Sequence, residues 1–218
     1  MRHIAVIDPA VRTAELDCFN RLVCHSTLPL THHLPGLFGT ASLQASSEGL
    51  AGVIVLGSAS SVHDNLSWQR ELMVWLKLQI DAGTPTLGLC FGHQLIAYLY
   101  GGKVAYLNEE KQKRQGFHQI TILKNRLWQA AQGLLFSSHR EAVMTCPQEF
   151  HIIAKSETVP IEGLEHNHLP LWTLQPHPEA TDTFLRNVNF SKRIEKDSFQ
   201  FGHSLAKRFL DWVGNPKS

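Results

Sequence analysis

Short apolar runs alternate with helix-like periodicity through the first half of the chain. The apolar runs predict three buried strands, at His3–Ile7, Gly52–Leu56 and Thr86–Leu89. Apolar residues at spacings of three and four, together with breakers such as Gly101–Gly102, predict three helices, at Val11–Cys24, Trp68–Asp81 and Gly92–Tyr100. Strands that alternate with helices predict an α/β fold, with an open, mainly parallel sheet and helices on both faces.

The second half of the chain has a less regular pattern. Three further strands are predicted, at Gln119–Leu123, Phe150–Ala154 and Leu171–Gln175. Few long helices separate these strands, so we expect antiparallel additions to the sheet. The polar segment Asn187–Phe199 is predicted to be a loop or a lid, and Ser204–Val213 an amphipathic helix.

Composition and charge narrow the class of protein. The 218 residues are 43% hydrophobic and 18% charged, which favours one α/β domain over residues 1–218. A formal net charge of +1 gives no electrostatic reason to expect nucleic acid or a membrane surface as a partner. No apolar run has the length of a bilayer span, and the apolar run at Ile4–Ile7 is too short for a signal peptide, so we expect a cytoplasmic protein.

The cysteines and histidines do not predict a metal site. The four cysteines form no CxxC pair and have no close Cys/His spacing. His32 and His33 stand in a proline-containing stretch, which favours a surface loop over a pair of metal ligands.

The strongest local feature is the segment Gly88–Gln94, where an apolar strand runs directly into a cysteine flanked by glycines and then into a helix. This pattern is typical of a nucleophile elbow, in which a sharp turn exposes the reactive atom of Cys90 above the sheet. The helix N-terminus favours a thiolate, and the backbone N–H of Phe91 is available to an oxyanion. The alternative is a small buried hydrophobic side chain at the end of a strand.

Two other segments supply the remaining groups that a cysteine nucleophile needs. Two prolines flank His177 after the predicted strand at Leu171–Gln175, and Glu179 follows two residues later. A histidine base and a carboxylate that accepts its hydrogen bond and orients it can have this arrangement. The Gly57–Ser58 turn also follows a strand, and its N–H groups are candidate oxyanion donors. Taken alone, the first segment is better explained as a proline-rich surface turn, and the second as an ordinary loop.

In order, spacing and context, these segments resemble the class I glutamine amidotransferases, whose fold is flavodoxin-like or Rossmann-like. The stretch Gly83–Tyr100 (GTPTLGLCFGHQLIAYLY) carries most of the resemblance. It implies a catalytic set of Cys90, His177 and Glu179. It further implies oxyanion and substrate-binding groups at Gly57, Ser58, Phe91, Gln94, Ser138 and His139. The chain departs from the family pattern at Arg140–Glu141, where relatives often have Asp two residues after the histidine.

The reaction that the resemblance implies is acyl transfer from glutamine or another γ-glutamyl compound, with no cofactor. Because nothing after Glu179 resembles an ATP-binding unit, the expected acceptor of ammonia lies on a separate synthase subunit. The motifs are similar both to the GMP synthase amidotransferase domain and to γ-glutamyl peptidases, and the peptidase function requires no partner. A catalytically silent binding or regulatory protein is the third alternative.

Overall fold

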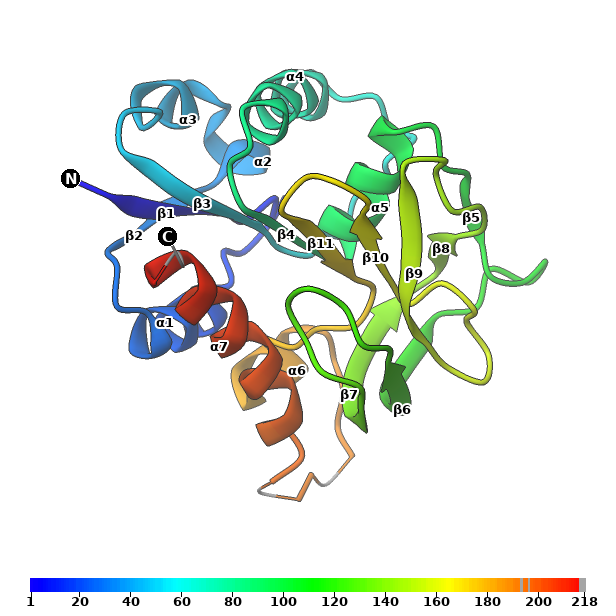
Figure 1. The fold of residues 1–218 in the computed structure, drawn as a ribbon. Coiled ribbons are helices and arrows are strands. Elements are labelled where there is room, and N and C mark those ends of the chain that lie inside the picture. The colour runs from blue at the N-terminus through cyan, green and yellow to red at the C-terminus, as the bar shows by residue number, and fades with distance from the viewer. Residues whose placement is uncertain (193, 196, 216–218) are drawn as a thin grey trace.

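A computed structural model describes residues 1–192, 194–195 and 197–215, and its centre is a nine-stranded sheet (Figure 1). The strand order is β2-β1-β3-β4-β11-β10-β9-β6-β7. The strands of this sheet are β1 (His3–Ile7), β2 (Leu30–His33), β3 (Leu50–Val55), β4 (Thr86–Leu89), β6 (Arg114–Ile122), β7 (Ala131–His139), β9 (Phe150–Lys155), β10 (Gly163–His166) and β11 (Leu171–Leu174). Two short strands, β5 (Val104–Tyr106) and β8 (Glu141–Val143), form a small separate sheet.

The large sheet has a parallel half and an antiparallel half. Strands β2, β1, β3, β4 and β11 run parallel to one another. Strands β10, β9, β6 and β7 continue the sheet in antiparallel pairs. The predicted fold class, a mainly parallel sheet with antiparallel additions, is therefore confirmed.

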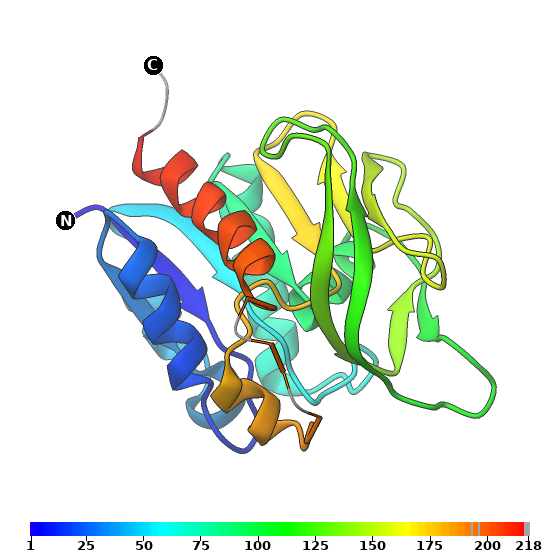
Figure 2. The same ribbon diagram turned by 90° about the horizontal axis from the view of Figure 1, so that it is seen from below.

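Helices cover both faces of the parallel half. The helices are α1 (Leu16–His25), α2 (Pro35–Phe38), α3 (Ala41–Ala45), α4 (Ser67–Asp81), α5 (Phe91–Leu99), α6 (Asp182–Asn187) and α7 (Gln200–Gly214). Helices α1 and α7 contact each other and lie on one face of the sheet, as the view from below shows (Figure 2). Helices α4 and α5 lie on the opposite face.

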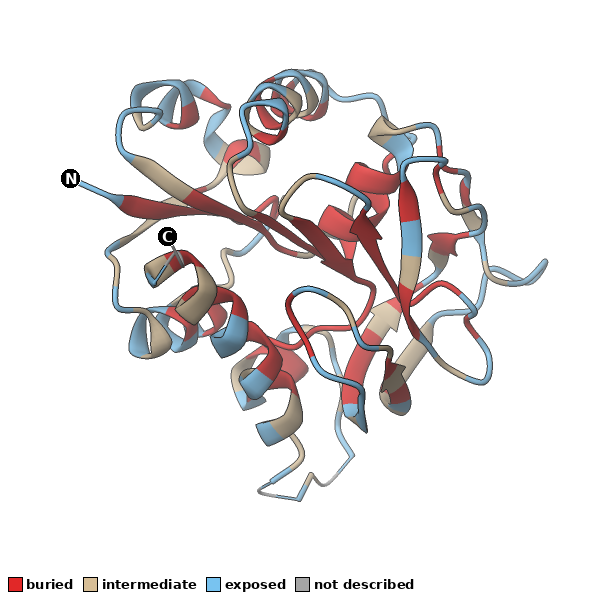
Figure 3. Ribbon diagram, in the orientation of Figure 1, coloured by how far each residue is buried: buried red, intermediate tan, exposed pale blue. Residues whose placement is uncertain are grey.

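Alternation along the strands explains why both faces are covered. In β3, Ile54 packs with α7 residues such as Phe209, whereas Val53 and Val55 pack with α4 residues such as Leu72. The strands of the parallel half are accordingly among the most deeply buried parts of the molecule (Figure 3). A strand buried on both faces gives the continuous apolar run that made these elements recognisable from the sequence.

The first predicted helix is wrong at its start. The prediction was Val11–Cys24, but α1 begins only at Leu16. The buried side chain of Asp8 accepts hydrogen bonds from the N–H groups of Ala10, at 3.1 Å, and Glu15, at 2.7 Å. These bonds hold residues 10–15 as a loop in place of a first helical turn.

The prediction of a surface loop at His32–His33 is also wrong, because both residues belong to edge strand β2, which pairs with β1. His32 lies 3.2 Å from the Asp8 carboxylate, and His33 is buried and bonded to Ser42 and Thr31. Burial lowers the pKa of His33 to about 4.

Other elements differ in extent from the sequence-based expectation. Strand β6 begins before the predicted Gln119, and α7 begins at Gln200, about one turn before the predicted Ser204. The predicted loop or lid at Asn187–Phe199 contains residues 193 and 196, which lie outside the described residues. Its first residue ends α6, and Phe190 and Phe199 pack against a third apolar cluster around Phe136.

Among the described residues, no helix combines the length and apolar character needed to cross a membrane.

Candidate active site

Three of the predicted site segments meet at one edge of the sheet. Strands β3, β4 and β11 are parallel neighbours, so their carboxyl ends lie side by side. Gly57 follows β3, Cys90 follows β4, and His177 follows β11. Open α/β sheets bind their ligands at this kind of edge.

The Cys90 backbone has the strained conformation of a nucleophile elbow. Its φ of 51° and ψ of −101° lie outside the regions that non-glycine residues favour. Hydrogen bonds fix the turn on both sides: the Cys90 N–H donates to the Leu174 carbonyl, at 2.9 Å, and the Gly92 N–H to the Leu56 carbonyl, at 3.3 Å. A β-carbon at residue 92 would lie 2.4 Å from the Val55 carbonyl oxygen, so only glycine fits.

His177 is held in place by contacts on three sides. Its backbone N–H donates to the Phe136 carbonyl, at 2.8 Å. This bond belongs to an isolated antiparallel bridge between His177 and β7. Its ring packs against Phe184, with centroids 4.6 Å apart, and its Nδ1 lies 2.9 Å from Oε1 of Glu179. Both His177 and Glu179 are buried, and Oε2 of Glu179 has no partner among the described residues.

The charge state of His177 depends on Cys90 and Glu179. Burial by itself lowers the pKa of His177, but hydrogen bonds and charge interactions with Cys90 and Glu179 outweigh burial and raise the pKa to about 10. A protonated imidazole beside Cys90 and the Glu179 carboxylate is therefore favoured at neutral pH.

The Gly57–Ser58 turn closes the site from the side of β3. The Ser58 hydroxyl donates to the Pro9 carbonyl, at 2.7 Å, and accepts from the Ser60 N–H, at 3.1 Å, which fixes the turn. Within the described part of the chain, no acceptor is paired with the N–H groups of Gly57, Ser58 or Phe91. Phe91 is the first residue of α5, so its N–H has no acceptor within the helix.

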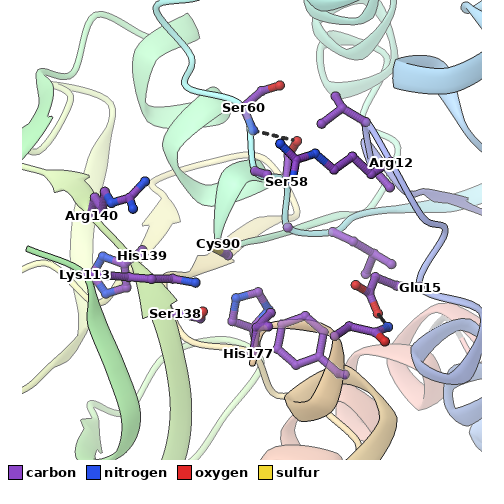
Figure 4. A pocket seen from close by; sticks show the side chains of 18 of the residues that line it. Arg12, Glu15, Ser58, Ser60, Cys90, Lys113, Ser138, His139, Arg140 and His177 are labelled. Carbon is purple, nitrogen blue, oxygen red and sulfur yellow. Dashed lines mark hydrogen bonds between the residues drawn. The ribbon is translucent and has the colours of Figure 1, made fainter. Parts of the chain in front are cut away.

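A cleft of about 520 Å³ opens over Cys90 (Figure 4). Of the residues that the sequence singles out, eight line this cleft: Gly57, Ser58, Cys90, Gln94, Ser138, His139, His177 and Glu179. The ninth, Phe91, has its side chain buried against Trp68, with ring centroids 5.9 Å apart, and its backbone begins α5 next to Cys90.

Gln94 and His139 have fixed orientations within the cleft wall. The side-chain amide nitrogen of Gln94 donates to the Glu141 carbonyl, at 2.7 Å, and to the side-chain oxygen of Gln175, at 3.1 Å. The Nδ1 of His139 lies 2.8 Å from the same Glu141 carbonyl. Burial lowers the pKa of His139 to about 3, so this histidine is neutral. With both amide hydrogens of Gln94 engaged, its side-chain oxygen is left to accept from a ligand.

The structure also brings into the cleft charged residues that the sequence did not predict to belong to the site. The loop at residues 10–15 contributes Arg12 and Glu15, and the opposite side contributes Lys113 and Arg140. The sequence pattern places Lys113 in a basic run typical of a solvated loop and Glu15 within a helix. Neither the spacing nor the type of these residues indicates the site, because loops far apart in the chain bring them there.

No group of three or more His, Cys, Asp or Glu side chains suited to a metal ion occurs in the described ranges 1–192, 194–195 and 197–215. The four cysteines are unpaired; Cys18 and Cys90 are buried, and Cys24 is exposed. Burial raises the pKa of Cys18 well above the usual value for a thiol, and the nearby carboxylates of Glu179 and Glu15 add to this shift. Cys18 is thus a poor nucleophile.

Comparison with known sequences identifies one family. The sequence model described as Glutamine amidotransferase class-I matches residues 19–195. One subunit of the glutamine-hydrolyzing GMP synthase of Pyrococcus abyssi is 38% identical over 108 residues, which are 47% of this chain and 55% of that protein. The same-named protein of Methanopyrus kandleri is 30% identical over 139 residues, covering 62% and 70%. The chain spans about half the length of the first of these relatives.

Solved structures share the fold. A glutamine amidotransferase from Thermotoga maritima superposes with a TM-score of 0.75 at 14% identity, covering 98% of each chain. A glutamine amidotransferase from Methylobacillus flagellatus gives a TM-score of 0.69 at 14% identity, covering 99% of this chain and 94% of that one. At this identity the likeness supports the fold alone.

Proposed function

Because this chain belongs to the class I glutamine amidotransferase family, we propose that it hydrolyses the γ-amide of glutamine, or a related γ-glutamyl bond, with Cys90 as the nucleophile. The observation that carries the proposal is the position of His177. Its Nδ1 lies 2.9 Å from the Glu179 carboxylate, and the charge of Cys90 raises its pKa, at the edge where three parallel strands end.

In this mechanism the Cys90 thiolate attacks the γ-carbonyl carbon, and the carbonyl electrons move onto the oxygen. The unpaired N–H groups of Gly57, Ser58 and Phe91 are the donors for that oxyanion. His177 gives its proton to the departing nitrogen as the C–N bond breaks, which leaves a γ-glutamyl thioester and neutral imidazole. His177 then removes a proton from water, which attacks the thioester and releases glutamate.

Glu179 has an orienting role in this scheme. Its bond to Nδ1 leaves Nε2 as the atom that exchanges protons with sulfur, leaving group and water. We assign the holding of the amino-acid end of the donor to the side-chain oxygen of Gln94, Ser138 and His139, a role supported by their position in the lining of the cleft.

The fate of the nitrogen is the second part of the proposal. The curated relatives are named as subunits of glutamine-hydrolyzing GMP synthase, which supports transfer of ammonia to a separate synthase subunit. A γ-glutamyl peptide is the alternative donor. The cleft volume supports it, because about 520 Å³ lies within the range of roughly 300–1,000 Å³ that suits ligands larger than an amino acid.

The test is an assay of glutamate release by the purified chain. Glutamine and a γ-glutamyl dipeptide are each supplied, with and without the separate synthetase subunit of a GMP synthase. Cys90→Ala serves as the control. Turnover of glutamine only with the partner supports a partner-dependent glutaminase; turnover of the dipeptide by the chain alone supports a peptidase. Unchanged turnover in Cys90→Ala contradicts the mechanism, and no turnover under any condition favours a silent binding protein.

A further inference from the structure

Two cationic side chains without acidic partners stand at one end of the cleft. Lys113 lies immediately before β6, and Arg140 lies between β7 and β8. Both line the cleft that contains Cys90. In the part of the chain that the structure describes, no carboxylate forms an ion pair with either of them.

The ammonium group of Lys113 lies near the nucleophile. Its side chain extends from the wall of the cleft toward Cys90 and His177 (Figure 4). Burial lowers the pKa of Lys113, the charge of Cys90 raises it, and the charge of Arg140 lowers it. The charge of Lys113 therefore interacts with both the Cys90 sulfur and the Arg140 guanidinium. An anion bound between Lys113 and Arg140 would reduce the repulsion between the two cations.

The surroundings of Lys113 match one end of an amino acid. Ser138 and His139 adjoin it in the cleft wall (Figure 4), and Glu141, whose carbonyl accepts from the Gln94 amide, brings a carboxylate to the same cleft. An α-amino acid presents one carboxylate and one ammonium group. Lys113 and Arg140 can pair with the carboxylate, and the Glu141 carboxylate can pair with the ammonium group.

We propose that Lys113 determines donor specificity by pairing its ammonium group with the α-carboxylate of the γ-glutamyl donor, with Arg140 as the second cation. This inference rests on the proposed function, because it assumes a γ-glutamyl donor at Cys90. Stabilising the thiolate is the other role open to a lysine here. The proposed mechanism already gives that role to His177 and to the N-terminus of the nine-residue helix α5.

Alkylation of Cys90 by two reagents separates the two roles. One reagent is a glutamine-shaped chloroketone with a free α-carboxylate, and the other is iodoacetamide, which has none. In Lys113→Met we expect the chloroketone to react roughly tenfold more slowly, the effect of one lost hydrogen bond to a charged group, and iodoacetamide to slow clearly less, because it loses only the charge interaction between Lys113 and Cys90. Lys113→Arg keeps the charge and is expected to restore most of the chloroketone rate.

The matched control is Lys111→Met, in the same segment. Lys111 lies over the Tyr106 ring, 4.7 Å from its centroid, and does not line the cleft, so both rates should stay unchanged. Equal slowing of both reagents in Lys113→Met would overturn the inference in favour of a thiolate role, and an unchanged chloroketone rate would overturn it outright. Failure of the proposed function is a separate result: the wild-type chain would release no glutamate, whatever the alkylation rates.

Discussion

Gly57 and His177 approach each other so closely that a β-carbon at residue 57 would lie 2.7 Å from Cε1 of the histidine ring. The same β-carbon would lie 3.5 Å from Cβ of Cys90. The turn after β3 thus touches both groups of the proposed catalytic pair. Glycine at this position serves the site directly, because any side chain would displace the imidazole.

Replacing Gly57 with alanine tests this relationship. We expect kcat to fall about a hundredfold, since a displacement of about 1 Å of a catalytic group has an effect of that size. Urea unfolding should show a loss of no more than about 1–3 kcal/mol, the usual effect of an added methyl group in a packed region. A kcat within a fewfold of wild type would show that His177 is not held by this contact.

Glu179→Gln tests the orienting carboxylate. The pKa of His177 is raised by Cys90 and by Glu179, so loss of the carboxylate should lower it. Activity in the alkaline range should then begin to fall at lower pH than in wild type, and kcat should drop by about a hundredfold or more. The measurement is the pH profile of kcat. A profile with an unshifted alkaline limb would argue against Glu179 as the partner of His177.

The pKa of His177 also makes stability depend on pH. The folded pKa of about 10 lies above the ordinary value of 6.5, so the folded state holds this proton more tightly than the unfolded chain. The stabilisation is fully present below about pH 6.5 and is lost as the pH rises through about 10. Urea unfolding between pH 6 and 10 should therefore show a steeper alkaline decline for wild type than for His177→Gln. Parallel curves would contradict the raised pKa.

His93 should make the free energy of unfolding fall as the pH drops into the acid range. It is fully buried under the elbow, with Nδ1 2.7 Å from the Thr173 hydroxyl, and burial lowers its pKa to about 3. The unfolded chain binds a proton here below about pH 6.5 and the folded chain does not, so stability falls as the pH drops from 6.5 toward 3. His93→Gln should flatten this acid decline in urea unfolding. An identical decline in the variant would mean that His93 does not contribute to it.

Gly92→Ala tests the packing of the elbow, with Gly101→Ala as its control. A β-carbon at residue 92 would meet the Val55 carbonyl oxygen at 2.4 Å, whereas at Gly101 it would meet nothing within 4 Å. Gly101 has a φ of 83°, so alanine there suffers only backbone strain, about 1 kcal/mol. We expect Gly92→Ala to lose clearly more, because a backbone carbonyl in a buried sheet cannot move aside. Equal losses in thermal unfolding would contradict this account of the elbow.

The parallel half of the fold was predictable from the sequence for a physical reason. Strands such as Thr86–Leu89 are buried on both faces, and Trp68–Asp81 carries a regular apolar stripe, so local composition is enough to identify them. The elbow around Cys90 was equally clear, because its glycines are required by close backbone contacts.

The rest of the fold and of the site depends on contacts between segments that are distant in the sequence. Strand β7 has a mixed polar and apolar sequence, and its pairing with β6 is what makes it a strand. Residues 10–15 carry helical periodicity, yet the Asp8 side chain holds their N–H groups in a loop. Lys113 lines the cleft from the β5–β6 connection, which lies outside the strand ends that carry Cys90 and His177. No local pattern encodes these meetings.

Trapping of the acyl-enzyme is the most direct measurement of the central claim. The wild-type chain is mixed with a γ-glutamyl donor, quenched in acid and mapped by mass spectrometry, with Cys24→Ala and Cys90→Ala analysed in parallel. We predict one γ-glutamyl group on Cys90 in wild type and in Cys24→Ala, and none in Cys90→Ala. Turnover accompanied by an acyl group on another residue, or by acylation that persists in Cys90→Ala, would contradict the account.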